Sequence, residues 1–382
     1  MSAHDPVIIV GGGLSGSLAA LMLAEKHPDA PVLLLEAGEN FGGNHLWSFF
    51  DTDVPPEASR LVAALDPVRW PRYRVAFPQR RRELAMAYNA VQSSALDALV
   101  RARLRGDRWR LGVKVAQVST HGVTLMSGET LAASAVIDAR GPEAVMPGLR
   151  LGWQKFVGIE FAARHPEPDC ALIMDATLPQ YDGYRFVYIL PLDAGRILVE
   201  DTYYCDRPGL DSAAIADRVR QIAAQRDILG AEIRQETGVL PIVLGGDPSV
   251  FWPVDDPIPR LGLRGGFFHP TTGYSFSCAL QRAAALPFQT LDTASLARWS
   301  RAEFMRHWKA TGYYRLLNRL LFHAAAPEER YNIFQHFYRL SPELIARFYA
   351  GKTSIADRLR IFSGKPPVPV VAAVRTLLTS PA

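Results

Sequence analysis

The fold of this chain can be inferred first from the stretch VIIVGGGLSG at residues 7–16. The β-branched run that opens it is typical of a fully buried parallel strand. The glycines that follow form the pattern Gly11-x-Gly13-x-x-Gly16, and an Ala- and Leu-rich helix is expected next, over residues 17–25. A short buried strand, a glycine turn and a helix make up the first half of a dinucleotide-binding βαβ unit.

The second half of that unit is present as well. Residues 32–35 are expected to form the second strand, which ends at Glu36, 20 residues after Gly16. In such units the first glycine permits a tight turn, the second lets the backbone approach a pyrophosphate, and the third lets helix and strand pack closely. The phosphate then meets free N–H groups at the helix N-terminus. We therefore predict that Gly11, Gly13 and Gly16 bind a dinucleotide, with Glu36 accepting a hydrogen bond from its ribose.

Composition excludes several other classes of protein. The 382 residues suggest two or three domains, and 48% hydrophobic residues with 21% charged residues exclude global disorder. Lys+Arg 42 against Asp+Glu 38 gives a formal net charge of +4, and this excess of positive charge is too small to indicate nucleic-acid binding. The three cysteines, Cys170, Cys205 and Cys278, lie far apart, so we expect a reducing compartment, no disulfide framework and no metal site. No signal peptide or transmembrane segment is expected, because a strand, a glycine turn and a helix explain the uncharged residues 7–24.

The order of the expected elements indicates a discontinuous organisation. Residues 136–141 have the pattern of a strand and turn that return to the first sheet, whereas residues 184–201 have the pattern of a β-hairpin in an antiparallel sheet. We expect a dinucleotide-binding domain from residues 1–150 and 260–300, a substrate domain with an antiparallel sheet over 151–259, and a helical, basic and aromatic region over 301–382.

Two later glycine-rich segments are also expected to approach the cofactor. Gly43 follows the second strand directly, and Gly266, Thr272 and Gly273 precede a helix expected over residues 277–286. Glycines permit close backbone approach to a ligand, and hydroxyl residues before a helix cap its free N–H groups or leave them for a ligand. We therefore add these four residues to the predicted cofactor contacts.

The segment 301–365 carries 12 Lys+Arg against 5 Asp+Glu, with aromatic residues interleaved from Phe304 to Tyr349. Basic helices with aromatic residues suit an anionic membrane surface. Helices that cover the core and keep solvated basic faces explain the same pattern equally well. For the first alternative, we expect a cytoplasmic protein that is peripherally associated with the inner face of the cell membrane.

Several longer motifs are more specific than the glycine pattern. They are GGNHLWSF at 42–49, GYRFVY at 183–188, EDT at 200–202, HPTTGYS at 269–275 and RFYAGK at 347–352. Together they resemble the bacterial lycopene beta-cyclase family of carotenoid biosynthesis, nearly end to end, as far as SGKPPVP at 363–369. The resemblance implies an α/β fold similar to flavin hydroxylases, with a Rossmann-like FAD-binding domain, an antiparallel-sheet substrate domain and C-terminal helices.

The resemblance also implies an activity. Lycopene would be converted through γ-carotene to β-carotene by an intramolecular lyase, which is an isomerase. Lycopene and related acyclic carotenoids are the expected partners. Reduced FAD would be required without net redox change, and NADPH would serve to keep the flavin reduced.

The chemistry requires an acid that protonates the terminal alkene and a base that removes a ring proton. The resemblance aligns Glu200 with the family's essential acidic motif, and the apolar run 197–199 before it favours a raised pKa. Strand alternation places Asp201 on the opposite face. Asp201, Glu160 and Asp175 are secondary candidates, and structural roles are expected for Glu160 and Asp175. From strand position alone, a glutamate here would more often face solvent or an ion pair.

Two rival functions stay open at this point. A redox flavoenzyme of the same fold could hydroxylate, epoxidise or reduce an isoprenoid, although Phe267 and Phe268 stand where hydroxylases carry a Gly-Asp phosphate motif. A non-catalytic flavin- or carotenoid-binding protein is the other. Product mass discriminates, because cyclisation leaves it unchanged.

Overall fold

The computed structural model describes residues 5–143, 145–364 and 367–379. Its first layer is a parallel sheet in the order β12 (Ala135–Asp138), β1 (Val7–Val10), β2 (Val32–Leu35) and β8 (Trp109–Arg110). All residues of β1 and β2 are buried, as expected for central parallel strands. Helix α1 (Leu14–Lys26) connects β1 to β2, so the predicted βαβ unit is confirmed.

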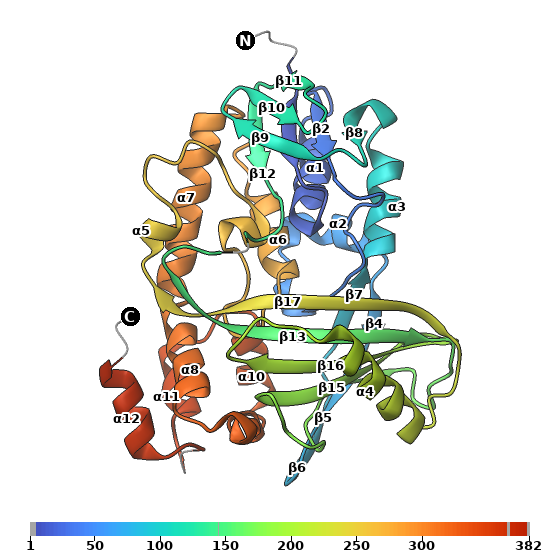
Figure 1. Ribbon diagram of the computed structural model, residues 1–382, viewed down its shortest axis with the longest axis vertical. Helices are drawn as coiled ribbons and strands as arrows, with labels where there is room; N and C mark the ends of the chain where they lie inside the picture. The colour runs from blue at the N-terminus through green and yellow to red at the C-terminus, as the bar shows by residue number, and fades with distance from the viewer. Residues whose placement is uncertain (1–4, 144, 365–366, 380–382) are drawn as a thin grey trace.

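Smaller elements surround this layer, from the top of Figure 1 down to its middle. The remaining elements from the first 132 residues here are α2 (Ser59–Ala64), α3 (Ser93–Arg103), the sheet of β9 (Val115–Ser119), β10 (Gly122–Leu125) and β11 (Thr130–Ala132), and the sheet of β3 (Leu46–Phe50), β7 (Tyr88–Gln92) and β4 (Val68–Trp70). The connection from β2 to β12 thus contributes several short elements before the chain returns to the parallel sheet.

A distant part of the chain also packs against the parallel sheet. Asp138 pairs with Arg260, and the N–H of Leu261 donates to the carbonyl of Asp138 at 2.9 Å. Helix α6 (Phe276–Ala284) then packs on α1 within one apolar core. Residues 260–284 therefore lie beside a sheet whose strands come from the first 138 residues.

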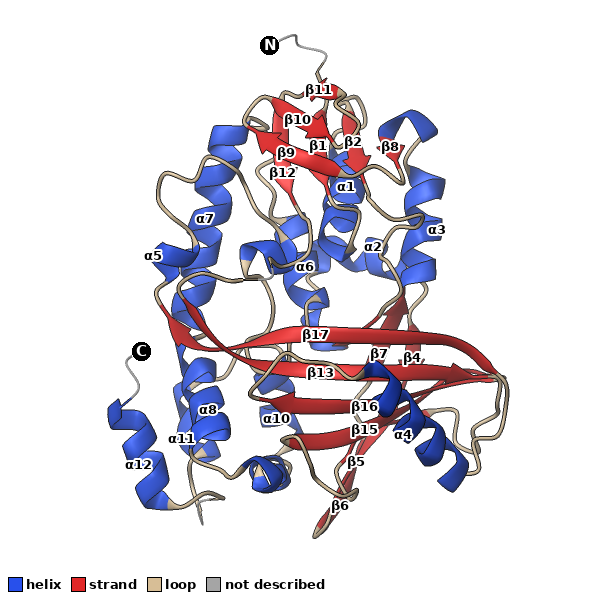
Figure 2. Ribbon diagram, in the orientation of Figure 1, coloured by secondary structure: helices blue, strands red, loops and turns tan. Residues whose placement is uncertain are grey.

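The second layer is a seven-stranded sheet that crosses the molecule beneath the first (Figure 2). Adjacent strands are antiparallel except for the parallel pair β14 and β5. The order is β17 (Glu232–Gly246), β13 (Leu149–Phe161), β16 (Arg196–Cys205), β15 (Tyr184–Asp193), β14 (Cys170–Asp175), β5 (Arg72–Phe77) and β6 (Arg80–Leu84).

Strands β5 and β6 differ from the expected division, which placed all of residues 1–150 with the nucleotide-binding layer. Tyr73, Val75 and Phe77 alternate with more exposed residues along β5, and their side chains join the aromatic core beneath the large sheet. Burial of this apolar face stabilises β5 in its place between β14 and the edge strand β6. The first part of the chain therefore contributes to both layers.

Helices cover both faces of the large sheet. Helix α4 (Ser212–Gln225) lies in front of it in Figure 1 and packs on side chains of β13, β15 and β16. The other elements of the second half are α5 (Pro248–Phe251), α7 (Thr293–Ala310), α8 (Gly312–His323), α9 (Tyr331–Phe337), α10 (Pro342–Tyr349), α11 (Ile355–Ile361) and α12 (Val370–Thr379).

Segment 301–365 was explained either by binding to a membrane surface or by helices that cover the core, and the C-terminal helices show where its aromatic residues lie. Tyr314, Tyr338 and Phe348 are buried in the same core as the aromatic residues of β15, so these rings cover the sheet. Lys365 and Pro366 of the C-terminal motif lie outside the described residues. Of the helices described, none combines the length and apolar character needed to cross a bilayer.

Candidate active site

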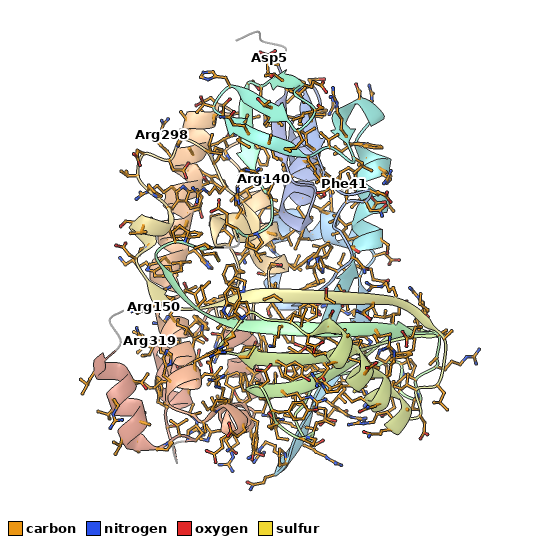
Figure 3. All side chains as sticks on the ribbon, in the orientation of Figure 1. Asp5, Phe41, Arg140, Arg150, Arg298 and Arg319 are labelled. Atoms are coloured by element: carbon orange, nitrogen blue, oxygen red, sulfur yellow. The ribbon has the colours of Figure 1, made fainter. Side chains whose placement is uncertain are left out.

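A cavity of ≈ 750 Å³ lies between the parallel sheet and the large sheet. One end is lined by the glycine turn after β1, by Glu36 and by Arg140, which Figure 3 shows between the two layers. The other end is lined by the inner face of the large sheet, where Phe156, Tyr188 and Glu200 are found. The cavity therefore joins a predicted nucleotide site to a predicted acid.

The glycine turn has the shape that a phosphate requires. Gly11 has φ +103, and a Cβ on it would lie 2.7 Å from the backbone nitrogen of Arg140. Gly16 does not line the cavity; a Cβ there would lie 1.9 Å from the Gly11 carbonyl, so this glycine permits close contact of α1 with β1. A Cβ on Gly13 would meet no described atom within 4 Å, and no described side chain caps α1. The first N–H groups of α1 are thus available to an anion.

Glu36 lines the cavity and also braces the glycine turn. Its carboxylate accepts hydrogen bonds from the N–H groups of Gly12 and Gly38, each at 2.7 Å. Arg140 likewise has a protein partner, since its guanidinium pairs with Asp138 at 2.7 Å. Both side chains are held in place at the rim of the cavity. An acceptor at Glu36 beside an open helix N-terminus fits a ribose and its attached pyrophosphate.

Two of the later glycines also line the cavity. Gly43 has φ +65 and Gly273 has φ +70, conformations that favour glycine. A Cβ on Gly273 would lie 3.2 Å from the side chain of Leu240 and 3.3 Å from Oε1 of Gln154. The backbone at these two positions therefore comes close to the cavity from opposite parts of the sequence.

Two predicted cofactor contacts lie away from the cavity lining. Gly266 packs against Phe304 of α7, and Thr272 is buried with its N–H donating to Nδ1 of His269. Gly262, four residues before Gly266, lines the cavity instead, with φ +61. The structure thus places Gly262 rather than the predicted Gly266 at the cavity, because a repeated glycine pattern does not reveal which turn faces it.

Glu200 lies on the cavity face of β16, opposite Tyr188 on β15. The hydroxyl of Thr202 donates to its Oε1 at 2.7 Å. Burial, reinforced by the nearby carboxylate Glu236, raises the pKa of Glu200 to about 8. A carboxyl group with such a pKa is largely protonated at neutral pH and is able to donate a proton into the cavity.

Asp201 points to the other face of β16, as strand alternation requires. Its side chain is 0% exposed. It pairs with Arg185 at 2.9 Å and accepts a hydrogen bond from the Tyr203 hydroxyl at 2.7 Å. Arg218 of α4 approaches it at 3.9 Å. The charge of Asp201 is therefore compensated within the protein, away from the cavity.

Glu160 and Asp175 are structural in their contacts. Glu160 is fully buried and pairs with Arg196 at 3.0 Å and Arg234 at 2.8 Å. Asp175 accepts a hydrogen bond from the Thr177 hydroxyl at 2.6 Å and forms an ion pair with a guanidinium near the end of α4. Neither residue lines the cavity.

The sequence did not single out Glu236, a buried carboxyl on β17 close to Glu200. It also did not single out a cluster of three hydroxyl groups, in which Tyr274 lies 2.8 Å from Tyr88 and 3.3 Å from Tyr188, oxygen to oxygen. Alternation along the long strand β17 does not show which charged residues meet across strands. The motifs at 183–188 and 269–275 contain Tyr188 and Tyr274, but they do not show that the two hydroxyl groups meet.

The sequence matches the profile of the family described as "Lycopene cyclase protein" over residues 6–375. The chain belongs to the lycopene cyclase family. It is 41% identical to "Lycopene beta-cyclase" of Pantoea ananas, over 383 residues that cover 100% of both chains. It is also 41% identical to the "Lycopene beta-cyclase" of a Paracoccus species, covering 99% of this chain and 98% of that one. These matches confirm the family that the sequence motifs resembled.

Solved structures confirm the fold class. A geranylgeranyl bacteriochlorophyll reductase-like protein from Thermoplasma acidophilum aligns with a TM-score of 0.63 at 14% identity, covering 98% of both chains. HpxO from Klebsiella pneumoniae, complexed with FAD and uric acid, aligns with a TM-score of 0.64 at 17% identity, covering 92% of this chain and 97% of that one. At these identities the likeness establishes the shared α/β fold of the lycopene cyclase.

Proposed function

We propose that this protein is a lycopene beta-cyclase that closes the ψ-ends of lycopene, through γ-carotene, to give β-carotene without net redox change. The observation that carries the proposal is Glu200, a carboxyl with a raised pKa that faces a cavity continuous with a nucleotide cradle. Full-length identity of 41% to proteins named lycopene beta-cyclase supports the same substrate.

The proposed reaction begins at the carboxyl of Glu200. Its proton forms a C–H bond with the terminal alkene of the ψ-end, and the resulting tertiary cation is attacked by the neighbouring double bond, which closes a six-membered ring. The ionised Glu200 then accepts the proton that leaves the ring carbon beside the cation, as the C–H electron pair becomes the ring double bond. One proton is donated and one is recovered, so no external acid or oxidant is consumed.

The cavity supplies what a carbocation requires. Phe156, Tyr188, Tyr274 and Trp47 present aromatic surface to it. Aromatic faces attract positive charge and exclude water, which would otherwise capture the cation. Such a lining favours ring closure over hydration of the intermediate.

The residues described above fit FAD. The turn at Gly11 and Gly13, with the N-terminus of α1, would hold the pyrophosphate, and Glu36 would hold the adenosine ribose. The backbone at Gly43 and Gly273 would contact the flavin half of the cofactor. When bound in reduced form, FAD supplies an electron-rich ring system that stabilises nearby positive charge. NADPH is the proposed source of electrons that keep it reduced.

The test is anaerobic incubation of the FAD-loaded enzyme with lycopene, comparing oxidised and photoreduced flavin. We expect β-carotene, of unchanged mass, only with the reduced flavin. A product heavier by an oxygen atom or by hydrogen would overturn the proposal in favour of a redox enzyme. Binding of lycopene without any conversion would favour a carrier.

We also propose peripheral membrane association through α11 and α12. Ile355, Leu359 and Leu378 are 76%, 69% and 82% exposed. The exposed cations Lys352 and Arg360 lie in or beside α11. Apolar side chains next to cations suit an anionic bilayer, where the substrate is dissolved. In a flotation assay with anionic liposomes, we expect binding at low salt that weakens at high salt; absence of binding at low salt would reject this part of the proposal.

A further inference from the structure

A row of side chains crosses four strands of the large sheet at the position of Glu200. Tyr188 of β15 pairs with Glu200 of β16, Glu200 pairs with Gly158 of β13, and Gly158 pairs with Glu236 of β17. Residues directly opposite each other on neighbouring strands project to the same face. The two glutamates therefore lie on the cavity side of the sheet, separated by one residue that has no side chain.

Gly158 leaves the space between the two carboxyl side chains open. A Cβ on Gly158 would lie 3.2 Å from Cγ of Glu236 and 3.4 Å from Cβ of Glu200. Any larger residue would stand as an apolar partition between them. Glu200 borders the cavity, and Glu236, which is 3% exposed, lies behind it.

The charges on this face balance only if one carboxyl is protonated. Three acidic groups, Glu160, Glu200 and Glu236, accompany two guanidinium groups, Arg196 and Arg234. Glu160 contacts both arginines directly. With Glu160 ionised, charge balance leaves at least one proton to be shared by Glu200 and Glu236.

The local contacts decide which of the paired glutamates carries the charge. Glu236 lies 3.5 Å from the guanidinium of Arg234 and accepts a hydrogen bond from the N–H of Leu46. Glu200 has only the hydroxyl of Thr202 as a hydrogen-bond donor among the described residues. Among the residues that the structure describes, none forms a hydrogen bond with Oε2 of Glu236. Burial raises the pKa of Glu236 to about 7, but the contacts with Arg234 and with the N–H of Leu46 keep it below that of Glu200, so the single negative charge is favoured on Glu236.

The remaining charged groups around the pair do not alter this assignment. Asp201 lies on the opposite face with Arg185. Asp193 contacts Arg196 from a turn where its side chain is 47% exposed, and solvent screens it there. His45, in the segment that precedes β3, has its pKa lowered by burial and by Arg234, so it is neutral near pH 7.

Resting on the proposed function, we propose that Glu236 holds the reactive proton on Glu200, so that the two carboxyl groups act as one acid pair with a single negative charge. Glu236 acts through Glu200 and is therefore a positioning residue. A negative charge on Glu236 disfavours ionisation of Glu200 before substrate arrives. After Glu200 has given its proton to the alkene, the same anion makes the new carboxylate a stronger base for recovering the proton from the ring carbon.

The experiment follows the protonation of Glu200 directly, by infrared spectroscopy of the FAD-loaded protein. The carboxylic C=O band that disappears in Glu200→Gln is assigned to Glu200 and titrated with pH in the wild type and in Glu236→Gln. We expect the midpoint to fall by about one pH unit or more in Glu236→Gln, because a like charge next to the acid has been removed. The alkaline limb of the pH–rate profile should move by the same amount.

Two further variants separate charge from structure. Glu236→Asp keeps the anion and should retain a midpoint closer to that of the wild type. Glu232→Gln removes an exposed carboxyl of the same strand that pairs with Arg220, and it should leave the midpoint unchanged. An unchanged midpoint in folded Glu236→Gln, or an equal shift in Glu232→Gln, would overturn the proposal.

Gly158→Ala provides an independent variant should Glu236→Gln fail to fold. The added methyl group would lie 3.2 Å from Cγ of Glu236 and 3.4 Å from Cβ of Glu200, so it changes the contact between them while both carboxyl groups are retained. The midpoint of Glu200 is expected to shift; no change would count against the pair. The infrared titration does not require turnover. Failure of the acid pair is therefore distinguishable from failure of the proposed cyclisation, which wild-type product analysis tests.

Discussion

The two faces of β16 place neighbouring carboxyl groups in opposite circumstances. Asp201 faces α4 and is fully buried with Arg185, Tyr203 and Arg218 around it. Glu200 faces the cavity with one hydroxyl donor and a second carboxyl nearby. A single step along the strand thus separates a compensated anion from a group that favours its neutral form.

The two carboxyl groups differ above all in their partners. Both residues are removed from bulk water, but Asp201 lies beside two guanidinium groups, whereas burial and the nearby Glu236 raise the pKa of Glu200. A group that retains its proton at neutral pH and borders a cavity is a candidate acid, whereas a saturated ion pair is structural.

The largest expected effect is on turnover in Glu200→Gln. The amide preserves size but has no acidic proton, so we expect lycopene conversion to fall by about 10²–10⁴-fold. Pigment analysis after anaerobic incubation measures it, with flavin content and thermal unfolding as controls for folding. Near-normal turnover would remove Glu200 from the acid role and with it the functional contrast between the two faces.

Asp201→Asn should instead reduce stability. The change leaves the buried guanidinium of Arg185 without its anion, and breaking such a pair costs about 3–5 kcal/mol. Denaturant unfolding of the FAD-loaded protein gives the free energy of unfolding for comparison with Glu200→Gln. If the two variants lost equal stability, the faces would not differ as described.

The pH dependence of stability should also separate the two variants. Because the pKa of Glu200 is raised from 4.5 to about 8 on folding, the folded state binds more protons, and this group lowers stability as pH rises through that interval. Glu200→Gln removes that loss, so its stability relative to the wild type should increase by about 3 kcal/mol between pH 5 and pH 8. Unfolding curves at several pH values measure the difference, and a flat difference would contradict the raised pKa.

The smallest effect is expected for Arg218→Ala. Its Nε lies 3.9 Å from Asp201, and its side chain is partly exposed and stacked near Tyr181 and Tyr203. Because Arg185 still compensates Asp201, we expect a loss below about 1 kcal/mol in the free energy of unfolding. A loss as large as that of Asp201→Asn would assign the main compensation to Arg218 instead.

Local patterns predicted the parts of the molecule that depend on neighbouring residues. The turn at Gly11, the parallel strands beside it and the alternation of Glu200 and Asp201 all follow from steric rules that operate over a few residues. The motifs added the family, and the whole-chain matches confirm it.

Contacts between distant strands were beyond such rules. Glu236 meets Glu200 only because β17 and β16 both pair with β13, in a register that places Gly158 between them. Gly266 was chosen for the cofactor although Gly262 lines the cavity, because the direction of each turn depends on packing against α7 and α1. Register and loop direction are properties of the assembled protein, and a single sequence carries little trace of them.

The parallel pairing of β5 with β14 has a consequence for the unity of the molecule. The polypeptide enters the large sheet early, through β5 and β6, then completes the nucleotide-binding layer and only later builds the other five strands. The backbone therefore passes several times between the two sheets that form the walls of the cavity. Excision of residues 151–259 would remove the neighbour of β5 and open the aromatic core, so the halves of this enzyme should melt in one cooperative transition.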